Sequence, residues 1–333
     1  MGSRDAVDDV DSAIIRVLVE SPRCSYSDLA ERVGVSAGTA QVRVKRLRQS
    51  RCVTIAGRVD PAVLGYGVFA FVFVEASRSA LEAARLLSRR PEAAFVVTVG
   101  GSAGLIAELR CRDWRHLMEV VGDTRRELRS AHTRLAILES YYKHDWSTFH
   151  SGAATANTHN ERPAYLVDDI DIDILKILAS DGRATYADIA RQAAVSPGTA
   201  RQRVKHLQQT GAVTVQTVVA SGLLGLAGYA AVGMTVTGPA ETIARQIAQQ
   251  APVALAATVL GAFDVVAEIG YRDFHDLGGT LDTLRCIPGV TQIESFPYLT
   301  ELKESMGSWP MDRHTTESPI TQQPALNPHQ PAP

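Results

Sequence analysis

The sequence predicts an α+β protein in which one two-part unit, a helix-turn-helix followed by a βαββαβ domain, occurs twice. Residues 7–54 align with residues 167–214 without a gap and share 22 identities in 48 positions. The same 160-residue offset continues through Gly65 and Gly225 into the later part of each copy. This period is far longer than that of a solenoid repeat, which indicates duplication of a whole unit.

The composition is that of a folded chain without a strong bias. Of the 333 residues, 45% are hydrophobic and 21% are charged, and the formal net charge is −2. Binding to nucleic acid must therefore come from local basic surfaces. The four cysteines are scattered, which favours reduced thiols over a disulfide framework or a metal site. Because the N-terminus lacks an apolar leader and no run of about 18 apolar residues occurs, we expect a cytoplasmic protein with no membrane partner.

Changes in composition predict the domain boundaries. The segment between the copies is polar and rich in small residues, as is typical of a linker. The C-terminal segment is too polar to bury a core. We expect helix-turn-helix domains at 1–57 and 165–217, βαββαβ domains at 58–146 and 218–304, a linker at 147–164 and a disordered tail at 305–333.

The first part of each copy has the helix signals of a helix-turn-helix. Apolar residues at helical spacing predict a first helix over Asp9–Glu20. Ser25 followed by Asp28 resembles a capping box for a short second helix. Gly34 is expected to end that helix in a tight turn, and Ser36 is expected to cap a third helix. The second copy repeats the apolar helix face and the capping signal, with Thr185 followed by Asp188, and has Ser196 at the position of Ser36.

The third helices have the features of DNA recognition helices. Residues 37–51 contain five basic side chains and no acidic one, and residues 197–211 contain three together with His206. In such a helix the N-terminal residues reach base edges and basic side chains bind phosphates. The alternatives are a solvated basic helix of an unrelated bundle and, for Arg43 and Arg203, a phosphate contact or an intradomain salt bridge. The expected DNA-binding residues are Ser36, Gly38, Thr39, Gln41, Val42, Arg43, Lys45, Arg46, Ser196, Gly198, Thr199, Arg201, Gln202, Arg203 and Lys205.

The second part of each copy predicts a four-stranded sheet with two helices. In the first copy, apolar runs predict strands at 66–76, 95–99, 105–109 and 134–142, with helices at 80–89 and between the last two strands. This βαββαβ order is that of a ferredoxin-like split βαβ fold. The expected buried face of the second helix comprises Trp114, Leu117, Met118 and Val121 in the first copy and Phe274, Leu277, Leu281 and Leu284 in the second.

Taken together, these motifs resemble the Lrp/AsnC family of transcription regulators. The resemblance covers roughly residues 7–143 and 167–303. It rests in the first copy on Asp11, Tyr26-x-Asp28-Leu29-Ala30 and Ser36-x-Gly38-Thr39-x3-Arg43-Val44-Lys45-Arg46-Leu47, and in the second on Asp171, Tyr186-x-Asp188-Ile189-Ala190 and Ser196-Pro197-Gly198-Thr199-x3-Arg203-Val204-Lys205-His206-Leu207.

The resemblance implies a winged helix-turn-helix joined to a RAM-type effector domain. Such domains dimerise through their sheets and bind a small effector, usually an amino acid, near the loop between the second and third strands. The resemblance also implies double-stranded DNA as a partner and assembly into homo-oligomers. Because family members usually carry one unit per chain, the two copies are expected to pair within this chain as a pseudo-dimer. The expected effector-binding residues are Gly100, Gly101, Ser102, Gly104, Gly261, Ala262, Phe263 and Asp264.

The two copies differ where ligands are expected. Asp264 could hold an effector ammonium group or could cap a tight turn, and the first copy has Gly104 at that position. The third helices differ as well, with Gln41-Val42 in one and Arg201-Gln202 in the other. Because glutamine pairs well with adenine and arginine with guanine, we expect two unlike DNA half-sites.

Other functions are less well supported. The sequence contains no nucleophile elbow, phosphate loop or metal-ligand spacing, so we expect no catalytic residues, no metal, no cofactor and no enzymatic activity. The alternative is an enzyme like the sirohaem decarboxylases, which share this architecture and line a tetrapyrrole cavity with histidines and arginines. His116 and His132 have no histidine counterparts, and His275 is expected on a helix surface.

Two further alternatives concern single residues and the whole chain. Glu108 and Glu268 occupy equivalent positions in the third sheet strand. They could face outward, or they could contact an effector amine or an interface arginine. An assembly protein that has lost DNA binding is a third function, which the basic third helices disfavour. We therefore predict a sequence-specific transcription regulator that responds to an amino acid or a related metabolite.

Overall fold

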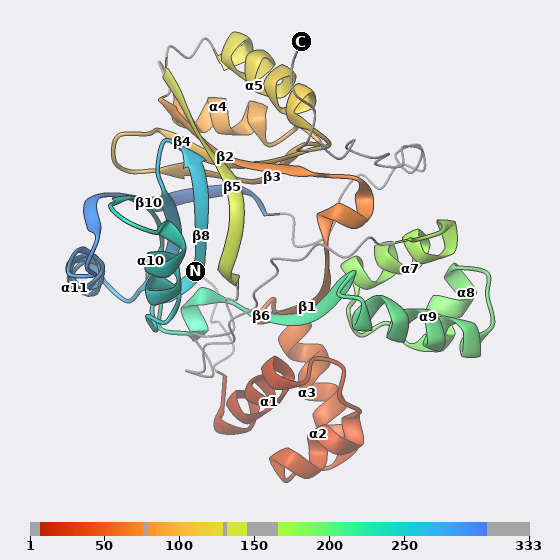
Figure 1. The fold of residues 1–333 in the computed structure, drawn as a ribbon. Helices are drawn as coiled ribbons and strands as arrows, with labels where there is room; N and C mark the ends of the chain where they lie inside the picture. The colour runs from red at the N-terminus through yellow and green to blue at the C-terminus, as the bar shows by residue number, and fades with distance from the viewer. Residues whose placement is uncertain (1–6, 76–78, 129–131, 145–165, 305–333) are drawn as a thin grey trace, which may run out of the picture.

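The structure, a computed structural model, describes residues 7–75, 79–128, 132–144 and 166–304. Each repeat forms a three-helix head followed by a four-stranded sheet with two helices, and Figure 1 shows the two heads beside one barrel. The linker expected at 147–164 and the tail expected at 305–333 lie outside the described residues. No helix in the described ranges is long and apolar enough to cross a bilayer.

Each head consists of three helices with capped N-termini. The helices are α1 (Asp9–Glu20), α2 (Tyr26–Val33) and α3 (Ala37–Gln49) in the first head, and α7 (Asp169–Ser180), α8 (Tyr186–Gln192) and α9 (Pro197–Gln209) in the second. The side chains of Asp8, Ser25 and Ser36 each accept a hydrogen bond from a backbone N–H three residues on, as N-caps do. Gly34 adopts a left-handed conformation with φ of 78°, which ends α2 as predicted.

Each head is completed by a strand from the other repeat. The strands β1 (Val53–Val59) and β6 (Val213–Val219) pair antiparallel along their whole length. Val219 packs into the core of the first head, and Val59 packs into that of the second. The resemblance implied a wing within each unit. Instead, β1 and β6 are each followed by a 3-10 turn and not by a second wing strand. Each of the two strands therefore pairs with the other copy.

The other eight strands close into one barrel. They are β2 (Val68–Glu75), β3 (Ala93–Val99), β4 (Leu105–Cys111), β5 (His132–His144), β7 (Gly228–Val236), β8 (Val253–Gly261), β9 (Val265–Tyr271) and β10 (Val290–Glu304). The two repeats have the equivalent strand orders β3-β4-β2-β5 and β8-β9-β7-β10, as the ferredoxin-like prediction requires. The two sheets join at both edges, where β5 pairs with β8 and β10 pairs with β3. The copies therefore pair within one chain, as predicted.

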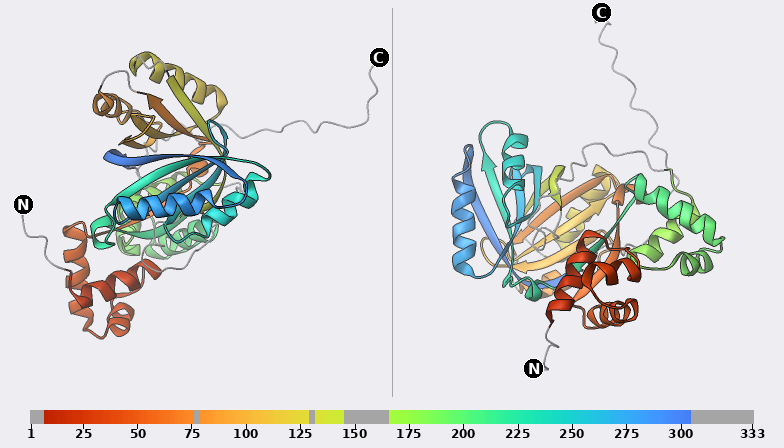
Figure 2. Two further views of the ribbon diagram at one scale, coloured as in Figure 1. Left: turned by 90° about the vertical axis from the view of Figure 1, so that its left-hand side faces the viewer. Right: turned by 90° about the horizontal axis from the view of Figure 1, so that it is seen from below.

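Two helices cover the outer face of each barrel half, as Figure 2 shows. They are α4 (Ala80–Leu87) and α5 (Trp114–Leu128) on one half, and α10 (Ala240–Ala248) and α11 (Phe274–Arg285) on the other. Leu117 and Val121 are buried as predicted. Trp114, Met118 and Phe274 were expected in the same faces but are 54%, 53% and 76% exposed. That expectation was wrong, because the barrel covers only one side of each helix.

Candidate functional site

The predicted recognition helices expose most of the side chains assigned to DNA. Exposed residues are Ser36, Gly38, Thr39, Gln41, Val42, Lys45 and Arg46 at α3, and Ser196, Gly198, Arg201, Gln202 and Lys205 at α9, whereas Thr199 is half-buried. The opposite side of α3 buries Ala40, Val44 and Leu47. Val42 is 69% exposed. An aliphatic side chain in that position is suited to contact a thymine methyl group.

Arg43 and Arg203 are engaged within their own heads. The Nη1 atom of Arg43 donates to both carboxylate oxygens of Asp8, at 2.7 and 2.6 Å, and to Asp11 at 3.0 Å. Arg203 makes the equivalent contacts in the second head. The hydrogen bond from Arg43 lowers the pKa of Asp8 to about 2. These arginines hold the third helix against the first, which is the intradomain salt bridge that the sequence allowed.

The two loops that were expected to bind the effector lie at one end of the barrel. Each of them bonds to the last strand of the other repeat. The N–H of Gly100 donates to the carbonyl of Pro297 at 2.9 Å, and the N–H of Ala262 donates to the carbonyl of Leu135 at 2.7 Å. The loops are therefore part of the joint between the two halves.

The side chains of the second loop are also engaged by the barrel. Phe263 is 6% exposed and lies in the barrel interior. One carboxylate oxygen of Asp264 accepts the N–H of Val236 at 2.8 Å. This oxygen is thus engaged by the end of β7 and not by a backbone N–H of its own turn.

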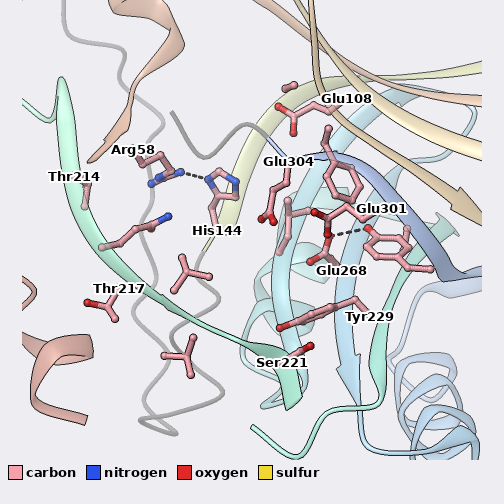
Figure 3. Close-up of a pocket in the computed structure, with 18 of the residues that line it drawn as sticks. Arg58, Glu108, His144, Thr214, Thr217, Ser221, Tyr229, Glu268, Glu301 and Glu304 are labelled. Carbon is pink, nitrogen blue, oxygen red and sulfur yellow. Dashed lines mark hydrogen bonds between the residues drawn. The ribbon is translucent and has the colours of Figure 1, made fainter. Parts of the chain in front are cut away.

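A cavity of about 470 Å³ lies between β6 and the barrel interior (Figure 3). Both repeats and the first head contribute to its walls. Apolar side chains from the barrel include Phe71, Phe95 and Leu255, and polar side chains of β6 include Thr214 and Thr217. The volume falls within the usual range for small-molecule sites.

Glu108 and Glu268 both line this cavity, from equivalent positions on β4 and β9. Arg110 Nε donates to Glu108 at 2.6 Å, and the hydroxyl of Tyr298 donates to Glu268 at 2.7 Å. The alternative in which these two carboxylates face outward is therefore wrong. β4 and β9 each lie between two other strands of the closed barrel, so the side chains on their inner faces point into the interior.

Two more carboxylates line the same cavity near the end of β10. Burial, together with the carboxylates of Glu301 and Glu268, raises the pKa of Glu304 to about 8. Burial also raises the pKa of Glu301. Crowded carboxylates with raised pKa values favour a positively charged partner, which relieves their repulsion. Arg58 and His144 are hydrogen-bonded to each other on another side of the cavity, as Figure 3 shows.

Arg58, His144, Glu301 and Glu304 were not predicted as site residues from the sequence. A signal for the two glutamates was present in the comparison of the repeats. Glu301 and Glu304 stand where the first copy has Tyr141 and His144. Acidic residues at these positions in only one copy indicate that the two halves contribute different groups to the site.

Comparison with known proteins identifies the parts of the chain. Residues 7–48 and 167–208 each match the AsnC-type helix-turn-helix domain, and residues 230–308 match the Lrp/AsnC ligand-binding domain. An HTH-type transcriptional regulator of Pyrococcus abyssi is 30% identical over 113 residues, which are 33% of this chain and 72% of that protein. The regulatory protein AsnC of Escherichia coli K12 is 29% identical over 34% of this chain and 78% of its own length.

A solved structure resembles the tandem arrangement as a whole. The siroheme decarboxylase NirDL matches with a TM-score of 0.64 and 16% identity over 89% of this chain and 93% of its own. This likeness contradicts the prediction that the chain is not an enzyme, because an enzyme has the same tandem architecture. The absence of catalytic motifs from the sequence was a poor guide, since a cavity between two halves can be built from scattered residues.

The domain matches and the relatives agree with the motifs in both heads and with the fold of the second barrel half. The chain belongs to the Lrp/AsnC family of transcription regulators, with two AsnC-type helix-turn-helix domains and an Lrp/AsnC ligand-binding domain in one polypeptide.

Proposed function

We propose that this protein is a sequence-specific DNA-binding regulator whose effector, an amino acid or a related metabolite, binds in the cavity between β6 and the barrel. The observation that carries the proposal is the position of β6. Residues 214–221 line the cavity, while Val215 and Val219 of the same strand pack against the first head. The backbone of β6 also pairs with β1. A ligand that moves β6 therefore acts on both heads at once.

The lining suits a ligand with an ammonium group, a carboxylate and an apolar body. Glu268, Glu301 and Glu304 offer oxygens to an ammonium group, and the guanidinium of Arg58 offers donors to a carboxylate. The aromatic walls provide an apolar surface for the remainder of the ligand. This arrangement favours an amino acid over a neutral sugar or a polyanion.

The heads supply the DNA interface. Exposed basic and polar side chains on α3 and α9 are the groups that hold phosphates and read base edges. Because the exposed residues Gln41 and Val42 differ from Arg201 and Gln202, each chain is expected to read two unlike half-sites.

The proposal is tested by a thermal-shift screen of the full chain against the common amino acids and their keto acids. A ligand of the folded state raises the melting temperature by mass action. The ligand found is then added to a DNA-binding titration of the native chain, and the thermal shift is repeated with Glu268→Gln and Asp264→Ala. We expect Glu268→Gln to abolish the thermal shift and Asp264→Ala to retain it. The opposite result would move the effector to the loops.

DNA binding has its own test. A regulator that neutralises several phosphates should lose affinity with rising salt, with a slope of about −0.9 per phosphate on a double-logarithmic plot. Absence of any binding at low salt would contradict the regulator and favour an assembly role.

We also expect copies of the chain to associate. Trp114 and Met118 lie one helical turn apart on α5 and are both more than half exposed, so they offer an apolar surface that a second copy could cover. Light scattering should report a particle of at least twice the chain mass of 35.9 kDa. A particle of single-chain mass would contradict this expectation.

A second candidate function is decarboxylation of a sirohaem-like tetrapyrrole. It is favoured by the whole-chain likeness to NirDL and by Arg58 and His144, which supply the cavity with an arginine and a histidine. The five glutamates of the lining are the feature that suits this substrate least, because tetrapyrroles of this class carry several carboxylates. Absorption spectra with added sirohaem, followed by an assay for released carbon dioxide, decide between the two functions. Binding with carbon dioxide release establishes the enzyme.

A further inference from the structure

At the loop end of the barrel, four equivalent positions of the two repeats carry contrasting residues. In three of them an aromatic residue in one repeat corresponds to glycine or alanine in the other, and in the fourth the two residues have opposite charges. The pairs are Phe73/Gly233, Ala103/Phe263, Ala136/Phe296 and Arg134/Glu294. The strand register around them is the same in both repeats, so the pairs are equivalent in space as well as in sequence.

The three aromatic rings form one buried cluster inside the barrel. The ring centroid of Phe73 lies 5.2 Å from that of Phe263 and 5.1 Å from that of Phe296. A Cβ atom placed on Gly233 would lie 2.5 Å from the ring of Phe263. Within the second repeat, the ring of Phe263 thus fills the space that Gly233 leaves open, and across the joint the ring of Phe73 packs against both rings of the second repeat.

The charged pair closes this cluster at its solvent side. Arg134 Nη1 and Nη2 donate to the two carboxylate oxygens of Glu294, both at 2.9 Å. The guanidinium carbon of Arg134 also lies 5.3–5.8 Å from the centroids of the three rings. A two-pronged arginine–carboxylate contact of this kind is directional and depends on both partners.

Pairing of two identical halves would lose both the packing of the three rings and the ion pair between Arg134 and Glu294. Two first repeats would bring only two rings together, between alanines, and would set Arg134 against a second Arg134. Two second repeats would bring four rings together and would set Glu294 against a second Glu294. The native cluster has three rings, so like pairing leaves either a cavity or an overfilled interior, together with two like charges.

We propose that these four residue pairs make each barrel half selective for the other repeat, so that the barrel forms only between unlike halves and rejects an identical half from a second chain. Specificity here comes from unfavourable contacts in the wrong pairing as much as from favourable ones in the right pairing. The proposal is independent of the effector and of DNA.

The charges are tested in the full chain with Arg134→Glu, Glu294→Arg and the double variant that carries both changes. Thermal unfolding followed by circular dichroism is the measurement. We expect each single variant to melt at least about 3 °C lower than the native chain, because like charges then meet across the joint. The double variant restores the pair with reversed polarity and should recover most of that loss.

The packing is tested by comparing a half-conversion with a complete exchange. In the half-conversion, Gly233→Phe, Phe263→Ala, Phe296→Ala and Glu294→Arg give both halves the residues of the first repeat. In the exchange, these four changes are combined with Phe73→Gly, Ala103→Phe, Ala136→Phe and Arg134→Glu. We expect the half-conversion to lose the cooperative barrel transition and the exchange, with twice as many changes, to regain it.

Two results would overturn the proposal. The first is a double charge variant that is no more stable than the single variants. The second is an exchanged chain that is no more stable than the half-conversion. In either case the contrast between the repeats would be unrelated to the choice of partner.

Discussion

Arg23 and Arg183 occupy equivalent positions in the two repeats, and each donates hydrogen bonds to the backbone of the other's head. Arg23 Nη2 donates to the carbonyl of Ala184 at 3.0 Å. Arg183 donates to the carbonyls of Pro22 and Cys24 at 2.7 and 2.8 Å. Together with the β1–β6 pairing, this exchange fixes the position of one head relative to the other within the chain.

Replacing Arg23 and Arg183 together by alanine should loosen the arrangement of the heads. Each substitution removes donors from two carbonyls, which costs roughly 1–3 kcal/mol for a buried group and less for a solvated one. We expect affinity for a duplex with two half-sites to fall at least about tenfold, while affinity for one isolated half-site stays the same. Fluorescence anisotropy with both duplexes measures the difference. Arg191→Ala, on an exposed face of α8, is the control, and equal losses on both duplexes would contradict the prediction.

Arg43→Ala and Lys45→Ala should weaken DNA binding by different routes. Arg43 holds α3 to Asp8 and Asp11, so its loss should lower the melting temperature of the chain as well as DNA affinity. Lys45 is exposed, so its loss should leave the melting temperature unchanged and reduce the salt dependence of binding by about one phosphate contact. Melting curves and salt titrations of both variants check this. A stable Arg43→Ala chain with a reduced salt slope would instead make Arg43 a phosphate ligand.

Selection of bound sequences from a random DNA pool should give two unlike half-sites. Val42 is exposed on α3 where α9 has Gln202, and the two side chains prefer different base edges. Val42→Gln should alter the selected sequence in one half-site and leave the other unchanged. A symmetric consensus for the native chain would show that these positions do not read bases.

The cavity should make the chain less stable as the pH rises from about 4.5 to about 8. The pKa of Glu304 is raised to about 8 in the folded chain, from an ordinary value of 4.5. A carboxyl with a raised pKa contributes stability that is fully present below 4.5 and is lost progressively until the pH has passed 8, because in that interval the unfolded chain releases the proton and the folded chain keeps it. Urea unfolding at pH 5, 7 and 9 should show this decline, and Glu304→Gln should flatten it. An equal slope in the variant would place the cause elsewhere.

Gly233→Ala should be destabilising, in contrast to Gly278→Ala in the same repeat. The added Cβ would meet the ring of Phe263, and overfilling of a packed core costs typically 1–3 kcal/mol. Gly278→Ala is the control, because Gly278 lies within α11 with open space around it and alanine is the better helix former there. Chemical denaturation measures both. A second change, Phe263→Ala, should reduce the cost of the alanine at position 233.

Local signals in the sequence were sufficient to predict the heads and the strand order. Ser36 and Gly34 define the turn before α3 through their own chemistry, and apolar spacing located the helices. The pairing of β1 with β6 could not be predicted in the same way. Both strands have similar apolar content, and their register depends on contacts between residues some 160 positions apart in the chain.

The candidate site was predicted less well than the fold. The loop residues around Asp264 were assigned to the effector from the family resemblance. In the structure, Ala262 donates a backbone hydrogen bond to the other half, and the Asp264 carboxylate accepts one from β7. The cavity could not be foreseen, because Arg58, Glu268 and Glu304 come from three strands and meet only after the barrel has closed. The residue pattern of a single strand does not reveal which side chains of other strands will lie beside it.

The exchange of strands between the heads has a consequence for synthesis of the chain. The core of the first head includes Val215, Val219 and Leu224, so this head is incomplete when its own helices leave the ribosome. It must wait until all three helices of the second head and β6 have been made, although chains generally fold from the N-terminus as they emerge. The polypeptide therefore acquires both heads at nearly the same moment, and a product truncated after the first repeat lacks even one finished head.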